Sequence, residues 1–255
     1  MNNNIIVQCN DISLSYMKEK NELLHVLDNI NFELKENEIV AIVGKSGAGK
    51  STFLRVMSGL IPATLGSVYY RSELVKNPLT RMSMVFQNFA LLPWLSVLDN
   101  VIFGLEAQGV KRKESEPKAR EIINKIGLNG FENSFISELS GGMKQRVGFA
   151  RALIVEPEVL LMDEPFSSLD ISTARQLREE IITLWSTKAI STKSMVVVTH
   201  NIEEAVLMAD RVVVFNNNPG SISNEIRINH NHPRDKKDHT IQNIVDSISN
   251  EMYAL

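Results

Sequence analysis

The stretch that decides the fold is Gly44-Lys45-Ser46-Gly47-Ala48-Gly49-Lys50-Ser51-Thr52, which follows the apolar run Ile39–Val43. Its glycines and its Lys-Ser pair match the spacing of a phosphate-binding loop between a strand and a helix. Small residues let backbone N–H groups point at phosphate oxygens, and a helix N-terminus adds about half a positive charge. We predict that all residues of the loop bind a nucleotide, with Lys50 at the β- and γ-phosphates and Ser51 as a Mg²⁺ ligand. A plain glycine-rich turn is the alternative.

Outside this loop, short apolar runs that end abruptly in polar residues predict further strands. Because the runs are continuous rather than alternating, both faces of the strands should be covered, as in a mostly parallel sheet. Helical periodicity separates them, for example from Ala119 to Ile126 and from Ala174 to Leu184. The sequence therefore predicts an α/β fold with a mostly parallel core sheet. The predicted strands are Ile39–Val43, Met82–Phe86, Val159–Met162, Met195–Thr199 and Val212–Phe215.

The remaining patterns predict the organisation of a single domain, residues 1–255. Alternation at Ile12, Leu14 and Tyr16, followed by Val26–Leu34 and Ser67–Tyr70, predicts a small antiparallel β subdomain. We expect a nucleotide-binding core at about 1–87 and 157–215, a helical subdomain at about 88–156, and a C-terminal tail at about 216–255 with a helix near Ile241–Ile248.

Composition excludes several classes of protein. The chain has 255 residues, a formal net charge of −3 and one cysteine, Cys9, so a disulfide scaffold and a basic nucleic-acid-binding surface are both disfavoured. Its apolar stretches are far shorter than the roughly 20 residues that a membrane span needs, and the N-terminal residues lack the pattern of a secretory signal. We expect a cytoplasmic protein whose Cys9 is an inert, packed thiol.

Two acidic residues, Asp163 and Glu164, stand where the run Val159–Met162 ends. Beside a phosphate-binding loop, a carboxylate at a strand end can face Mg²⁺ while the next residue polarises a water molecule. We therefore predict Asp163 on the metal side and Glu164 as the general base. A polar strand cap is the alternative.

The stretch Leu139-Ser140-Gly141-Gly142-Met143-Lys144-Gln145-Arg146 resembles the signature motif of ABC-type ATPases. Ser140 is a good N-cap, and Gly141 and Gly142 expose the N–H groups of a new helix, which makes a second anion site. An ordinary capped helix is the alternative. The resemblance implies a head-to-tail dimer, most simply a homodimer, in which each ATP lies between the phosphate loop of one subunit and the signature of the other.

Further positions resemble this family in the expected order. Tyr16 stands where the family keeps an aromatic that stacks on adenine, and Gln87 resembles the loop glutamine that senses Mg²⁺ and water. Asp170 belongs to a segment that resembles the dimer-contact loop, and His200 resembles the switch histidine that contacts the γ-phosphate. These likenesses imply that Gln87 and His200 assist catalysis and that Tyr16 and Asp170 lie at the nucleotide.

A narrower resemblance, to the nitrate, sulfonate and taurine importer branch, appears in the stretch from Phe86 to Val101. It implies that separate permease subunits contact the chain near Gln87–Leu95 and that an extracytoplasmic solute-binding protein completes the system. Pro93 and Trp94 are then interface residues, although local core is the alternative. Met143 and Ser168 depart from the broad ABC pattern, and Met143 is usual in this branch.

The resemblance implies an ATP-hydrolysing importer subunit that needs Mg²⁺ and lies on the inner face of the membrane. Three alternatives stay open: an importer of another organic solute, a non-transport ABC ATPase, and a nucleotide-binding module without turnover. The histidines of the tail, His230, His232 and His239, have loose spacing without cysteine, so we expect a solvated tail rather than a zinc site.

Overall fold

A computed structural model describes residues 4–17 and 22–254 of the chain. The chain forms two compact units, one made of residues 1–79 with 193–255 and the other of residues 80–192. Within the described residues no helix is both long and apolar enough to cross a membrane.

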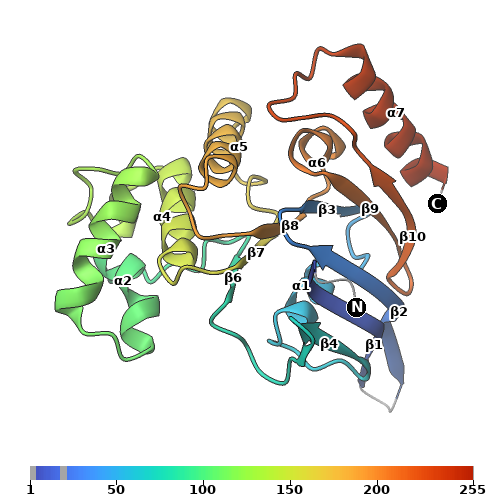
Figure 1. Ribbon diagram of the computed structural model, residues 1–255, viewed down its shortest axis with the longest axis horizontal. Helices are drawn as coiled ribbons and strands as arrows, with labels where there is room; N and C mark the ends of the chain where they lie inside the picture. Colours follow the sequence, from blue (N-terminus) through green and yellow to red (C-terminus); the bar gives the residue numbers. More distant parts are fainter. Residues whose placement is uncertain (1–3, 18–21, 255) are drawn as a thin grey trace. The chain divides into compact units, whose positions relative to one another are not determined.

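The first unit contains the small antiparallel sheet that the alternating pattern predicts (Figure 1). Val7 of β1 pairs with Leu34 of β2 on one side and with Tyr70 of β4 on the other, so β1 lies between β2 and β4. Four strands follow the order β2-β1-β4-β5, with bounds β1 Ile5–Met17, β2 Leu23–Lys35, β4 Leu65–Tyr70 and β5 Glu73–Leu74.

The same unit holds the strands around the phosphate loop. Strand β3 pairs in parallel with both β8 and β9, and β10 adds to β9 in antiparallel register. Every residue of β3 and β8 is buried, as continuous apolar runs predict. The bounds are β3 Ile39–Gly44, β8 Ser194–Val198, β9 Arg211–Asn216 and β10 Ser221–Arg227, with helices α1 Lys50–Met57, α6 Ile202–Met208 and α7 His239–Ala254.

Three aromatic rings form a cluster behind the phosphate loop. Phe53 of α1 lies 5.7 Å from Phe32 of β2 and 5.6 Å from Phe215 of β9, measured between ring centroids. Phe53 is fully buried, so the cluster joins the antiparallel sheet, helix α1 and the core strands. Aromatic pairs at such distances add stability beyond their buried area, which fixes α1 under the loop.

The second unit combines two parallel strands with a layer of helices, of which α2, α3 and α4 lie together (Figure 1). Arg146 of α4 forms an ion pair with Glu180 of α5 and donates to the Ile126 carbonyl at 2.7 Å. The bounds are β6 Met82–Val85, β7 Val159–Asp163, α2 Val97–Ala107, α3 Arg112–Lys125, the 3₁₀ helix η2 Ile136–Glu138, α4 Gly141–Leu153 and α5 Ile171–Ser186.

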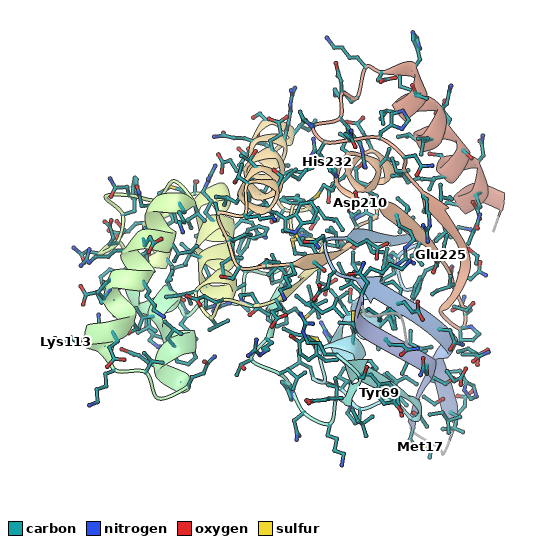
Figure 2. All side chains as sticks on the ribbon, viewed as in Figure 1. Met17, Tyr69, Lys113, Asp210, Glu225 and His232 are labelled. Atoms are coloured by element: carbon teal, nitrogen blue, oxygen red, sulfur yellow. The ribbon has the colours of Figure 1, made fainter. Side chains whose placement is uncertain are left out.

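The C-terminal residues are not uniformly solvated, and the expectation of a solvated tail is wrong for part of it. The side chain of Arg234 is 1% exposed and that of His232 is 13% exposed. Asp210 and His232, both labelled in Figure 2, lie close together, with 3.6 Å between Oδ1 and Nε2. The guanidinium of Arg234 donates hydrogen bonds to the carbonyl oxygens of Val206 and Ala209. These bonds offset the cost of burying its charge.

Candidate functional site

The phosphate loop follows β3 and leads into α1, and two of its glycines are required by close neighbours. A Cβ at Gly44 would lie 2.7 Å from the Phe215 carbonyl oxygen. Gly49 has a φ of +82°, and a Cβ there would lie 2.8 Å from Leu27 Cδ2. Both positions therefore exclude larger residues for reasons of space, and at Gly49 also of backbone conformation.

Lys50 lies under this loop. Its ammonium donates hydrogen bonds of 2.8 Å to the carbonyl oxygens of Gly44 and Lys45, and the residue is 5% exposed. Lys45, Ser46 and Gly47 are exposed at the loop surface. The loop thus combines a fixed positive charge with a helix N-terminus, which is the chemistry of a phosphate site.

The carboxylate pair ends β7 in the second unit. Asp163 is the buried last residue of the strand, and Glu164 follows with a φ of +46°, an uncommon conformation for a side chain of this size. Gln87, which follows β6, donates from Nε2 to Glu164 Oε2 at 3.1 Å. The parallel pairing of β6 and β7 places both residues at the same strand ends, so the unit brings Gln87 and Glu164 together.

The signature stretch begins α4. The hydroxyl of Ser140 accepts a hydrogen bond from the Met143 N–H at 3.3 Å, which confirms Ser140 as the N-cap. A Cβ at Gly142 would lie 2.5 Å from Thr173 Cγ2 of α5, so the packing of two helices demands glycine here. Ser140 and Gly141 are exposed at the start of α4.

Asp170 is the N-cap of α5. Its Oδ1 accepts from the N–H groups of Ser172 and Thr173 at 3.1 and 3.0 Å, and from the Ser172 hydroxyl at 2.5 Å. Hydrogen bonding from the side chains of Ser172 and Thr173, and then from their backbone N–H groups, lowers the pKa of Asp170. Asp170 is therefore ionised at neutral pH and holds the start of α5.

His200 and Tyr16 are the remaining predicted site residues in the first unit. His200 follows Thr199, the first residue after β8, precedes Asn201, the N-cap of α6, and is exposed. The Thr199 N–H donates to the Ile42 carbonyl of β3 at 3.1 Å, which ties this strand end to the strand of the phosphate loop. Tyr16 pairs with Leu24 near the end of β1 and is 42% exposed.

Two residues without an assigned role in the sequence, Asn100 and Arg151, contact the segment that follows Gln87. Asn100 is 0% exposed and binds the backbone of Leu92, and Arg151 binds the carbonyl oxygens of Phe89 and Ala90. Its place among the apolar residues Val97, Leu98, Val101 and Ile102 is the only sign in the sequence of such a role for Asn100.

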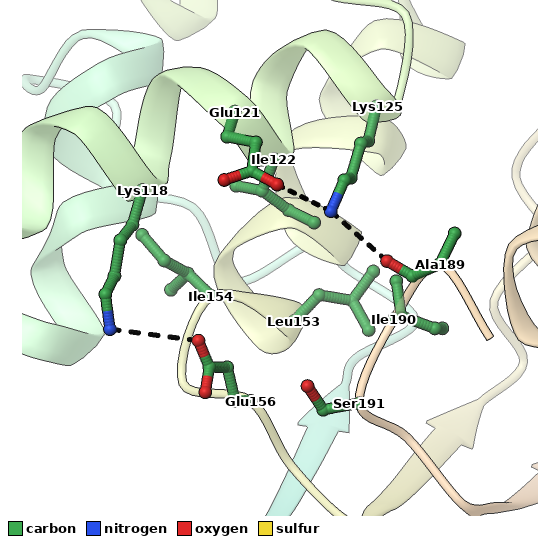
Figure 3. A pocket seen from close by; sticks show the side chains of 10 residues that line it. All are labelled: Lys118, Glu121, Ile122, Lys125, Leu153, Ile154, Glu156, Ala189, Ile190 and Ser191. Atoms are coloured by element: carbon green, nitrogen blue, oxygen red, sulfur yellow. Dashed lines mark hydrogen bonds and ion pairs between the residues drawn. The ribbon is translucent and has the colours of Figure 1, made fainter.

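Cys9 and a small cavity lie apart from these residues. Burial raises the pKa of the Cys9 thiol, which confirms it as an unreactive, packed side chain. The cavity, of about 90 Å³, lies between α3, the end of α4 and residues 189–191 (Figure 3). Its Lys118 and Lys125 pair with Glu156 and Glu121 at 3.8 and 2.8 Å. The lysines of this cavity are thus already neutralised, and we assign it no ligand.

Comparison with known proteins places these residues in a family. The family description "ABC transporter" matches residues 27–167. The chain is 42% identical over 199 residues to the taurine import ATP-binding protein of Rhizobium johnstonii, covering 78% of this chain and 75% of that protein. It is 44% identical over 203 residues to the nitrate import ATP-binding protein of Synechocystis, covering 80% and 75%. It is 37% identical over 238 residues to the aliphatic sulfonates import ATP-binding protein of Bacillus thuringiensis, covering 93% and 92%.

A solved structure agrees with these relatives. It is a dimeric ATP-binding cassette in a post-hydrolysis state, bound to ADP and Pi, with a TM-score of 0.78 and 30% sequence identity. The likeness covers 89% of this chain and 100% of that chain. The resemblance to this family and the α/β fold are thereby confirmed: the chain belongs to the ABC transporter family, among its ATP-binding ATPase subunits.

Proposed function

We propose that the chain is the ATPase subunit of an importer for a small solute of the nitrate, sulfonate or taurine type. The names of its relatives support this solute class. The observation that carries the catalytic part is the hydrogen bond from Gln87 to Glu164 at the end of the β6–β7 pair. It orients a carboxylate that directly follows a buried strand, as a general base requires.

Nucleotide binding is assigned to the first unit. Lys50 donates to the β- and γ-phosphates, and the N–H groups of residues 44–52 surround them. Tyr16, with a largely accessible ring, stacks on adenine. These groups hold the adenine and the phosphates of ATP, so together they bind and orient the substrate.

The proposed metal ligands fit Mg²⁺ by their chemistry. Ser51, Gln87 and Asp163 offer a hydroxyl, an amide oxygen and a carboxylate, which are the oxygen ligands that this ion prefers. When bound, Mg²⁺ neutralises charge on the phosphates.

Hydrolysis is assigned to Glu164 and His200. The Glu164 carboxylate accepts a proton from the attacking water, and Gln87 holds that carboxylate in place through Nε2. His200 donates a hydrogen bond to the γ-phosphate and thereby stabilises the negative charge that develops on its oxygens in the transition state. Ser140, Gly141 and Gly142 of a second copy bind the same phosphate across a head-to-tail homodimer, and Asp170 fixes α5 beside that signature. Release of phosphate then weakens the contact between the copies.

Contact with the permease is assigned to residues 87–95, and it would hold the subunit on the inner face of the membrane. Trp94 is 70% exposed, which favours an interface residue over local core. Phe103, Phe131 and Phe135 of the same unit are also 43–51% exposed. Exposed aromatic side chains are the typical anchors of protein interfaces.

The variant Glu164→Gln tests the catalytic assignment. It keeps the size of the side chain and its contact with Gln87 but cannot accept a proton, so kcat should fall about 100-fold or more while ATP still binds. Glu179→Gln, on the exposed side of α5, is the matched control and should behave as wild type. If Glu164→Gln hydrolyses ATP as fast as wild type, the assignment of the general base fails.

Purification from native membranes tests the transport assignment. The chain should co-purify with a permease, and a thermal-shift screen of the neighbouring solute-binding protein should identify a nitrate, sulfonate or taurine-like ligand. Stable association with ribosomes or DNA instead, without a permease, would support a non-transport ABC ATPase.

A further inference from the structure

The segment from Gln87 to Ser96 has an irregular backbone that is held at two places by side chains from other elements. Phe89 and Ala90 have φ values of +57° and +48°, a left-handed conformation that is unfavourable for residues with a Cβ. A conformation of this kind persists only when its surroundings hold it. The two residues that hold it are Arg151 of α4 and Asn100 of α2.

Arg151 binds the first strained part of the segment. Its Nη1 donates to the Ala90 carbonyl at 2.6 Å and its Nη2 to the Phe89 carbonyl at 2.9 Å. Burial lowers the pKa of this guanidinium, and among the described residues no carboxylate forms an ion pair with it. Burying an arginine without a carboxylate partner costs desolvation free energy. The two hydrogen bonds to the carbonyl oxygens of Phe89 and Ala90 offset that cost, because the planar guanidinium can donate to both at once.

Asn100 binds the second part. Its Oδ1 accepts from the Leu92 N–H at 2.8 Å, and its Nδ2 donates to the carbonyls of Leu92, Leu95 and Ser96 at 3.0, 3.2 and 2.9 Å. Leu92 and Leu95 also close a turn, with 3.1 Å from the Leu95 N–H to the Leu92 carbonyl. Pro93 and Trp94 lie at the tip of this turn, where Trp94 is 70% exposed.

These contacts form one connected series inside the second unit. Glu164 contacts Gln87, residues 89–90 contact Arg151 on the same helix that begins with the signature, and the turn that carries Trp94 contacts Asn100. We infer that Asn100 and Arg151 are positioning residues, which hold residues 88–95 so that a displacement of Trp94 reaches both Gln87 and helix α4. The inference rests on the proposed function, in which Glu164 is the base and residues 87–95 contact the permease.

ATPase kinetics of the isolated chain provide the first test. Arg151→Met removes both donors and should lower kcat about tenfold, because a small misplacement of a catalytic group has effects of this size or larger. The KM for ATP should stay within about twofold, because no residue of the phosphate loop is changed. Arg151→Lys offers a single point donor and should restore part of the activity. Arg120→Met, which removes an exposed arginine paired with Glu116 on α3, should leave both constants unchanged.

Amide hydrogen exchange provides a local measurement that does not depend on activity. In Arg151→Met and in Asn100→Ala, exchange should increase in residues 88–95, while the strands and the other helices keep their protection. Time-resolved anisotropy of Trp94 in a Trp185→Phe background should decrease in the same variants, because the turn gains freedom.

The outcomes separate this inference from the proposed function. If Glu164→Gln is inactive but Arg151→Met and Asn100→Ala leave kcat and local exchange unchanged, the positioning role is wrong and the general base stands. If exchange increases throughout the chain, or if kcat and KM change together, the two residues only stabilise the fold and the inference is overturned. If Glu164→Gln retains full hydrolysis, the proposed function fails, and the exchange data still decide whether the segment is held.

Discussion

Gly142 shows how a single residue of the signature stretch is determined by packing rather than by helix propensity. It lies in the first turn of α4, where alanine would ordinarily be the better helix former. Its missing Cβ leaves room for Thr173, whose Cγ2 would lie 2.5 Å from it. Thr173 cannot turn away freely, because its own N–H is bound to Asp170 and its side chain is β-branched.

Gly142→Ala should therefore destabilise the protein by about 1–3 kcal/mol, as overpacking does. The matched control is Gly148→Ala on the same helix, where the nearest atom, the Phe89 carbonyl oxygen, would lie at an ordinary 3.8 Å. That variant should instead stabilise by roughly 0.5–1 kcal/mol. Urea unfolding measures both.

The double variant Gly142→Ala with Thr173→Ser isolates the clash. Serine lacks Cγ2, and the next atom of residue 173, its Cβ, would lie 3.9 Å away. The double variant should regain most of the stability that Gly142→Ala loses. The coupling free energy between the two positions should therefore be about 1 kcal/mol or more. Simple additivity of the two changes would show that the contact with Thr173 is not the cause.

At the scale of the element, the start of α2 depends on one hydroxyl. Ser96 accepts from the Asp99 N–H at 3.1 Å and donates to the Asp99 carboxylate at 2.6 Å, and Arg112 of α3 donates to the same carboxylate at 2.6 Å. The Ser96 hydrogen bond is the main cause that lowers the pKa of Asp99, with Arg112 adding to it against partial burial. The carboxylate thus links the N-terminal ends of two helices.

Ser96→Ala should cost about 1 kcal/mol at neutral pH, as loss of an N-cap does. Because the folded-state pKa of Asp99 is lowered, its contribution is complete above the ordinary value of 3.8 and is lost as the pH falls through the lowered value. The difference in unfolding free energy between wild type and variant should therefore become smaller as the pH is lowered from 5 into the acid range. Urea unfolding at each pH measures this difference. Ser186→Ala, near the end of α5, is the control, and a difference for Ser96→Ala that does not change with pH would contradict the role of Asp99.

At the scale of the whole molecule, residues far apart in the sequence tie the C-terminal segment to the first unit. Arg234 donates to the carbonyls of Val206 and Ala209 at the end of α6, at 2.7 and 2.5 Å, and twice to that of His230. Asp210 accepts from the Ile39 N–H of β3 at 2.8 Å and lies 3.6 Å from His232 Nε2 through its Oδ1. Burial opposes ionisation of Asp210, but the interaction with the nearby His232 and the hydrogen bond from the Ile39 N–H outweigh it and lower its pKa.

Arg234→Met should destabilise the protein by about 1–3 kcal/mol, because several buried carbonyls lose their donor. Arg227→Met, at the exposed end of β10, should change stability by less than about 0.5 kcal/mol. Thermal and urea unfolding measure the effect. Equal stability of the two variants would show that the tail does not hold α6.

The local part of the site could be predicted from the sequence because it depends on short spacing. The phosphate loop, the Ser140 cap and the strand ends at Gln87 and Glu164 each follow from residues a few positions apart, where backbone geometry leaves few choices. The same holds for β3, β7 and β8, whose continuous apolar runs have no other stable place than a covered sheet.

Long-range contacts were decided by the tertiary structure alone. Arg151 and Ala90 are 61 positions apart, and nothing local distinguishes Arg151 from a solvated arginine. Arg234 is buried although its segment is polar, since the carbonyls at the end of α6 need donors that only the folded chain supplies. The sequence by itself determined the family and the chemistry of the nucleotide site. The tertiary structure decided which side chains hold that chemistry in place, because a long side chain can reach partners that no spacing reveals.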